Sequence, residues 1–241
     1  MLMMKIIPTK RILTDVKSVI SKLNSTGFDY LVAGGTMLQF YLAKYARFSS
    51  DLDIVTCADL DEVEKLFRKT FDVLAFSIHR IDKTNLLETF SSLIDIDGQT
   101  ILVEGMRVSF YKDIKRIDCV IDDVPFVGVS VEFILAEKVD ALINDDISFY
   151  KHLVDLYSAS LFDESLIDKR EIKKYLLLFI NSYHQVRESL GLKEETVSYR
   201  INPNIKFKDS YLLAALQASH NISLPSMKIE VNKYLKLIGE Q

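Results

Sequence analysis

Apolar positions recur with two different periods along the chain, and the pattern changes near Ser130. Before Ser130, segments with an apolar residue every three or four positions, typical of amphipathic helices, alternate with short apolar runs typical of buried strands. The pattern predicts helices over 9–25, 36–45 and 60–70 and strands over 28–33, 51–56, 73–78, 90–96, 100–103, 107–111 and 117–121. Asp97-Gly98, between two of these strands, is typical of a tight β-hairpin turn.

From Ser130 onward the period is helical. The predicted helices cover 130–143, 148–161, 164–188, 208–219 and 226–238. Asp145-Asp146 separates two helical patterns and indicates a turn there. We therefore expect an α+β fold: a domain at 1–145 with a mixed sheet flanked by helices, followed by an all-helical domain at 146–241.

The composition is typical of a globular chain. Its 241 residues are 49% hydrophobic and carry a net charge of −4, and no apolar run is long enough to cross a membrane. The first ten residues are too short and too soon interrupted by Pro8 for a signal peptide. Cys57 and Cys119 lack metal-binding spacing. We expect a cytoplasmic protein without a membrane partner.

Candidate chemistry is concentrated between residues 34 and 53. Gly34 and Gly35 follow an apolar run, and Asp51 and Asp53 begin the next one. Residues two apart in a strand point to the same face, so the two carboxylates would project together. Adjacent carboxylates are tolerated best around a cation, and Mg²⁺ suits oxygen ligands and substrate phosphates. Glycines and a helix starting at Thr36 would let a phosphate approach the backbone.

A second candidate is Lys138, which falls in the middle of the apolar stripe of helix 130–143. A lysine in that position must extend its head to solvent or meet an anion. The residues leave three alternatives open: a solvated head, an ion pair with Glu132 or Asp155, or contact with nucleotide phosphates.

Three blocks of this sequence together resemble the AbiEii/AbiGii toxin family of nucleotidyltransferases, whose fold is similar to that of DNA polymerase β. The first block is Gly34-Gly35-Thr36 with Arg47, Ser49, Asp51, Leu52 and Asp53; the second runs from Ser130 to Leu142; the third is Lys151-His152-Leu-Val-Asp155-Leu156. His152 departs from the family, which usually has Asp there, so its role stays open.

The resemblance implies a role for each matching residue. Asp51, Asp53, Lys138 and Asp155 would be catalytic, and Asp51 and Asp53 would also bind Mg²⁺ or Mn²⁺. The residues implied to bind the nucleotide are Gly34, Gly35, Thr36, Arg47, Ser49 and Lys138. Arg47 could equally form a salt bridge to Asp51 or Asp53.

Such transferases often have a third acid on a nearby strand. The candidates are Glu104, Asp118 and Asp122, and we name Asp118 as the metal ligand to test.

The family also implies a function: transfer of a nucleoside monophosphate from a nucleoside triphosphate to tRNA, by a toxin with a cognate antitoxin. Two alternatives remain open. The acceptor could be an antibiotic or a protein side chain, since antibiotic-modifying transferases share the glycine loop and Asp-x-Asp. The chain could also be a catalytically degenerate module that only binds nucleotide.

Overall fold

The computed structural model describes residues 12–42, 49, 51–82, 86–144, 149–160 and 167–192. The helices predicted over 208–219 and 226–238, the predicted boundary at Asp145-Asp146 and Arg47 lie outside these residues. Within them, no helix has the length and apolar character needed to span a membrane.

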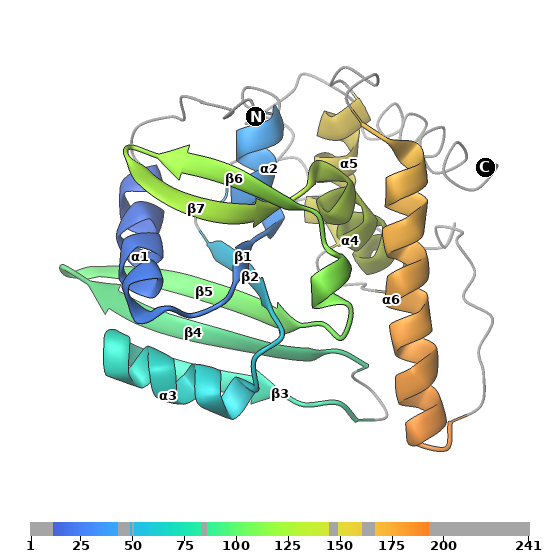
Figure 1. Ribbon diagram of the computed structural model, residues 1–241, viewed down its shortest axis with the longest axis horizontal. Helices are drawn as coiled ribbons and strands as arrows, with labels where there is room; N and C mark the ends of the chain where they lie inside the picture. The colour runs from blue at the N-terminus through green and yellow to red at the C-terminus, as the bar shows by residue number, and fades with distance from the viewer. Residues whose placement is uncertain are drawn as a thin grey trace.

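A seven-stranded mixed sheet forms the centre of the described structure, in the order β3-β4-β5-β2-β1-β7-β6 (Figure 1). The strands are β1 (Leu31–Val32), β2 (Leu52–Thr56), β3 (Asp72–His79), β4 (Glu88–Ile96), β5 (Gln99–Arg107), β6 (Arg116–Ile121) and β7 (Val124–Val129). Strand β2 is parallel to β5 and antiparallel to β1, whereas β1 is parallel to β7. These pairings bring segments far apart in sequence beside β2.

Two helices cover one face of this sheet (Figure 1). They are α1 (Ile12–Thr26), which contacts β4, β5 and β7, and α3 (Leu60–Thr70), which contacts β3 and β4. Helix α3 begins and ends where the periodicity predicts, since Asp59 caps its first turn by accepting a hydrogen bond from the Asp61 amide. Phe67 on α3 packs edge-on against Phe76 and Phe90 of the sheet.

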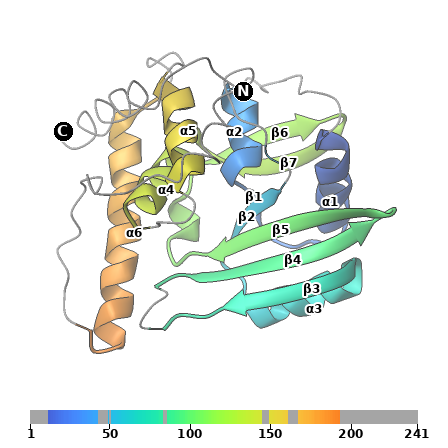
Figure 2. The same ribbon diagram turned by 180° about the vertical axis from the view of Figure 1, so that it is seen from behind.

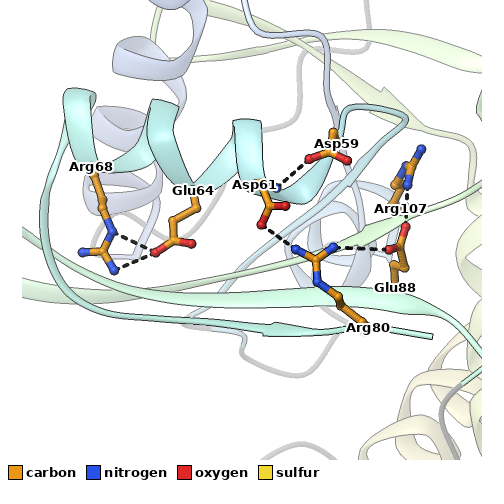
Figure 3. Close-up of polar contacts among 7 residues, drawn as sticks. All are labelled: Asp59, Asp61, Glu64, Arg68, Arg80, Glu88 and Arg107. Carbon is orange, nitrogen blue, oxygen red and sulfur yellow. Dashed lines mark hydrogen bonds and ion pairs between the residues drawn. The ribbon is translucent and has the colours of Figure 1, made fainter. Parts of the chain in front are cut away.

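Ion pairs attach the start of α3 to the neighbouring strands (Figure 3). Arg80, after β3, pairs with Asp61 of α3 and with Glu88 of β4. Arg107, at the end of β5, also pairs with Glu88, at 2.6 Å. These charged side chains therefore have a structural role.

The other helices gather at one side of the sheet (Figure 2). They are α2 (Gly34–Leu42), α4 (Val131–Asn144), α5 (Phe149–Ser160) and α6 (Lys169–Ser189). Helix α4 contacts each of the other three. Phe133 of α4 packs against Tyr175 and Phe179 of α6, which fixes the position of α4 and of the polar side chains it carries.

The predicted hairpin turn is confirmed: Asp97 and Gly98 have φ of 54° and 80° between β4 and β5. One strand prediction is wrong, and one strand was not predicted. A strand over 107–111 does not form, because β5 continues to Arg107 and a short 3-10 turn then covers Tyr111–Asp113. Strand β7 was missed, and a turn at Asp122 and Asp123, both with positive φ, joins it to β6.

Candidate active site

Strand β2 presents Asp53 on the face opposite the core. Its neighbours Leu52 and Ile54 are buried, as their alternation predicts. Asp51 lies one residue before the strand begins. The two carboxylates therefore come from the end of a loop and the start of a strand, rather than from two positions of one strand.

The two glycines pack against the Asp53 side chain and do not form an open loop. Helix α2 begins at Gly34, two residues earlier than predicted, and Gly34 has φ of +57°. The Gly35 amide donates a hydrogen bond of 2.9 Å to Asp53 Oδ2. A Cβ atom on Gly34 would lie 1.9 Å from the same oxygen. The glycine pair that was expected to bind phosphate therefore packs against the Asp53 carboxylate, and the Gly35 amide already donates its hydrogen bond to that carboxylate.

Thr36 and Gln39 of α2 hold the segment that precedes β2. The Thr36 hydroxyl donates a hydrogen bond of 2.6 Å to the Asp51 carbonyl, and the Gln39 amide donates one of 3.2 Å to the Ser49 carbonyl. Thr36 is only 2% exposed and Ser49 is also buried. Thr36, which the resemblance assigned to nucleotide binding, therefore holds the backbone at Asp51, and Ser49 is held by Gln39. Sequence reasoning missed Gln39.

Lys138 is buried, with 5% exposure, in the apolar stripe of α4, where the sequence predicts it. Its Nζ lies 3.1 Å from Glu137 Oε1, so the head is paired within the protein and does not extend to solvent. The predicted partner Glu132 instead accepts a hydrogen bond from the Asp168 amide. Burial alone would lower the pKa of Lys138, but Glu137, Asp155 and Asp53 outweigh it and the net shift is upward.

Asp155 is completely buried on α5, which excludes a solvent-exposed ion pair with Lys151. It lies close enough to Lys138 to raise the pKa of that ammonium. His152, one turn earlier, is half-buried. The structure thus brings together Asp53 of β2, Lys138 of α4 and Asp155 of α5.

Burial raises the pKa of Asp53 to about 7. The positive charge of Lys138 and the hydrogen bond from Gly35 act in the opposite direction, whereas Glu137 and Glu104 add to the rise. An acid with so high a pKa lacks sufficient positive charge around it, and a bound cation would supply it.

Glu104 lies beside Asp53, because the parallel register of β5 and β2 pairs these two residues. Asp118 lies on β6, three strands from β2 in the sheet, or about 14 Å at ordinary strand spacing. Asp122 lies in a turn and pairs with Lys17 at 3.9 Å. The strand order therefore places Asp118 away from Asp53, and its assignment as a metal ligand stays a prediction. Alternation in β5 predicts that Glu104 lies on the other face of the strand from the buried Ile101 and Val103. The sequence does not predict that β2 and Asp53 lie beside it.

Within the described ranges, no three His, Cys, Asp or Glu side chains form a ready-made metal cluster. Mg²⁺ is commonly held by one or two carboxylates together with substrate phosphates. Asp51 and Asp53 supply hard oxygen donors of that kind, and Glu104 lies in register with Asp53, so these residues fit a metal that arrives with its nucleotide.

The sequence matches the family described as "Nucleotidyl transferase AbiEii toxin, Type IV TA system" over residues 25–233. The chain belongs to the AbiEii family of nucleotidyltransferases. The matched residues include the glycine pair, Asp53, Lys138 and Asp155. No curated protein gives a significant match to this AbiEii chain.

Solved structures agree on the fold of this AbiEii protein. A Helicobacter pylori protein described as a candidate nucleotidyltransferase has a TM-score of 0.52 at 15% identity, with 96% of each chain covered. The protein JHP933 from Helicobacter pylori has a TM-score of 0.50 at 13% identity, covering 97% of this chain and 94% of that one. The predicted α+β fold with a mixed sheet flanked by helices is confirmed.

Proposed function

We propose that this AbiEii enzyme transfers a nucleoside monophosphate from a nucleoside triphosphate to tRNA, in a reaction that requires Mg²⁺ or Mn²⁺. The observation that carries the proposal is the convergence of a buried lysine and several acids from separate elements. Lys138 lies within electrostatic reach of Asp53 and Asp155, and Glu104 lies in register with Asp53. A buried cation among acids suits a site that handles both phosphate and metal.

Asp51, Asp53 and Glu104 would hold the metal, which when bound would neutralise charge on the phosphates. Gly34 and Gly35 fix the direction of the Asp53 carboxylate, and Thr36 fixes the backbone at Asp51. The Asp53 carboxylate and the Asp51 backbone are therefore placed before substrate arrives, which lowers the reorganisation needed during reaction.

Lys138 would act on the leaving group. Its acidic neighbours keep it protonated, so it can meet the negative charge that develops on pyrophosphate. In the transfer, the acceptor hydroxyl oxygen bonds to the α-phosphorus and the bond from that phosphorus to the pyrophosphate oxygen breaks. The hydroxyl proton passes to a carboxylate of the site.

The acceptor and the biological role rest on the family. Its description as a type IV toxin supports a toxin that an antitoxin counteracts. A tRNA acceptor would place the reaction in the cytoplasm.

The test is a transfer assay with purified protein, Mg²⁺, each nucleoside triphosphate labelled at the α-phosphate, and three acceptors: total tRNA, lysate protein and aminoglycosides. Label on tRNA that disappears with Asp53→Asn or with chelator supports the proposal. Label on protein or aminoglycoside would replace tRNA as the acceptor. No label on any acceptor would overturn it. Growth arrest on expression, absent for Asp53→Asn, tests the toxin role separately.

A further inference from the structure

Lys138 and Glu137 are neighbours in sequence, yet their side chains meet. Consecutive side chains on a helix point about 100° apart and do not face each other. Nevertheless, Lys138 Nζ and Glu137 Oε1 are 3.1 Å apart. The Glu137 side chain must turn around the helix to reach the ammonium.

The surroundings of this pair differ from those of a surface ion pair. The side chains of Lys138 and Glu137 are 6% and 17% exposed. Glu137 Oε2 is buried, and no residue that the structure describes gives it a hydrogen bond. Glu171 and Lys174 on α6 have the same 3.1 Å separation but are far more exposed. Burial of a carboxylate is costly, so the position of Glu137 requires compensation by Lys138.

Glu137 also lies near the carboxylate of Asp53, whose pKa it helps to raise. The Lys138 ammonium therefore has three acids around it: Glu137 on its own helix, Asp155 on α5 and Asp53 on β2. Among the described residues, Glu137 Oε1 accepts a hydrogen bond of 3.1 Å from Nζ, and this contact fixes where the ammonium lies.

We propose that Glu137 is a positioning residue that holds the Lys138 ammonium away from Asp53. This inference rests on the proposed function, because it assigns Asp53 to the metal and Lys138 to the phosphates. Without the Glu137 charge, the nearest anions left to the ammonium are Asp53 and Asp155. An ammonium that moves onto Asp53 occupies the oxygen that a metal needs, and it leaves the place from which it reaches pyrophosphate.

Kinetics of Glu137→Gln test this role, since glutamine keeps the shape and removes the charge. We expect kcat to fall at least tenfold and the Mg²⁺ concentration for half-maximal rate to rise at least threefold, with KM for the nucleotide changed less than threefold. Glu137→Asp should recover part of kcat. Glu171→Gln is the matched control and should behave as wild type. A kcat for Glu137→Gln within twofold of wild type would overturn the proposal.

A double-variant cycle with Lys138→Met shows whether Glu137 acts through Lys138. If it does, Glu137→Gln has little further effect on the residual rate in the Lys138→Met background. A similar fold-loss in both backgrounds would contradict the assignment.

The same cycle on the unfolding equilibrium in urea needs no activity. A combined effect that departs from the product of the single effects by at least about threefold supports the pair. If wild type transfers no nucleotide but the cycle shows coupling, the proposed function fails and the contact stands. Independent effects on unfolding would sink the positioning role itself.

Discussion

Gly34 and Asp53 are packed so closely that no side chain fits between them: a Cβ at position 34 would lie 1.9 Å from Asp53 Oδ2. Gly34 also has a positive φ that disfavours other residues. Gly34→Ala should therefore displace the Asp53 carboxylate and cost about 3 kcal/mol or more in the free energy of unfolding.

A transfer assay and urea unfolding check this prediction. Activity of Gly34→Ala should fall at least about 100-fold, as expected when a metal-site carboxylate is lost from its place. Gly27→Ala is the control, because Gly27 has φ of +71° with no atom within 4 Å of an added Cβ. It should lose about 1 to 2 kcal/mol of stability and keep its activity. Equal activities of the two variants would contradict the packing argument.

Thr36 is predicted to act through its hydroxyl. Thr36→Val keeps the shape but removes the hydrogen bond to the Asp51 carbonyl, which should cost about 1 kcal/mol of stability and roughly tenfold in kcat. Thr36→Ser should restore most of the rate. If the hydroxyl instead binds phosphate, the loss will appear mainly in KM for the nucleotide.

The raised pKa of Asp53 predicts how stability depends on pH without metal. Because its pKa is about 7 when folded and near 4 when unfolded, the folded state binds the proton more tightly. The free energy of unfolding should therefore decline as pH rises from about 4 to 7, and the penalty stays at higher pH. Urea unfolding of wild type and Asp53→Asn in EDTA at pH 5 and pH 8 measures this. The asparagine variant should gain relative stability at pH 8, and a gain only at pH 5 would refute the assignment.

Lys138→Met should lower kcat by about 100-fold or more, because methionine fills the same buried space without the charge. It should also lower the free energy of unfolding by about 3 kcal/mol, because the buried Glu137 carboxylate loses its partner. Lys138→Arg should retain little activity, since a larger planar head cannot keep the contact with Glu137. Steady-state kinetics, with circular dichroism to confirm folding, checks the prediction. Near-normal kcat for Lys138→Met would remove Lys138 from the chemistry.

Glu104 and Asp118 give opposite predictions as candidates for the third acid. Glu104→Gln should raise the Mg²⁺ concentration for half-maximal rate and lower the rate by at least about tenfold, because Glu104 lies beside Asp53 in the register of β5 and β2. Asp118→Asn on β6 should behave as wild type. Titration of the transfer rate with Mg²⁺ distinguishes the two, and the reverse ranking would point to a different metal site.

Periodicity predicts elements whose own residues determine them, such as α1, α3 and the Asp97-Gly98 hairpin. It also places Lys138 on the apolar stripe of α4. It does not predict partners across the sheet: the neighbourhood of Glu104 and Asp53 depends on β5 lying parallel to β2, and nothing local specifies that register. The start of α2 at Gly34 likewise depends on Asp53, which is distant in sequence and accepts a hydrogen bond from the Gly35 amide.

The order of the strands and helices along the sequence determines when the site can form during synthesis. Asp53 lies on an early strand, but its neighbours arrive only with β5, α4 and α5. Contacts between such distant segments form late, since closing the intervening loops is entropically costly. A partly synthesised chain would therefore have the glycine pair and the aspartates without Lys138 or Asp155. In the cell, the enzyme would become active only after α4 and α5 have packed against the sheet.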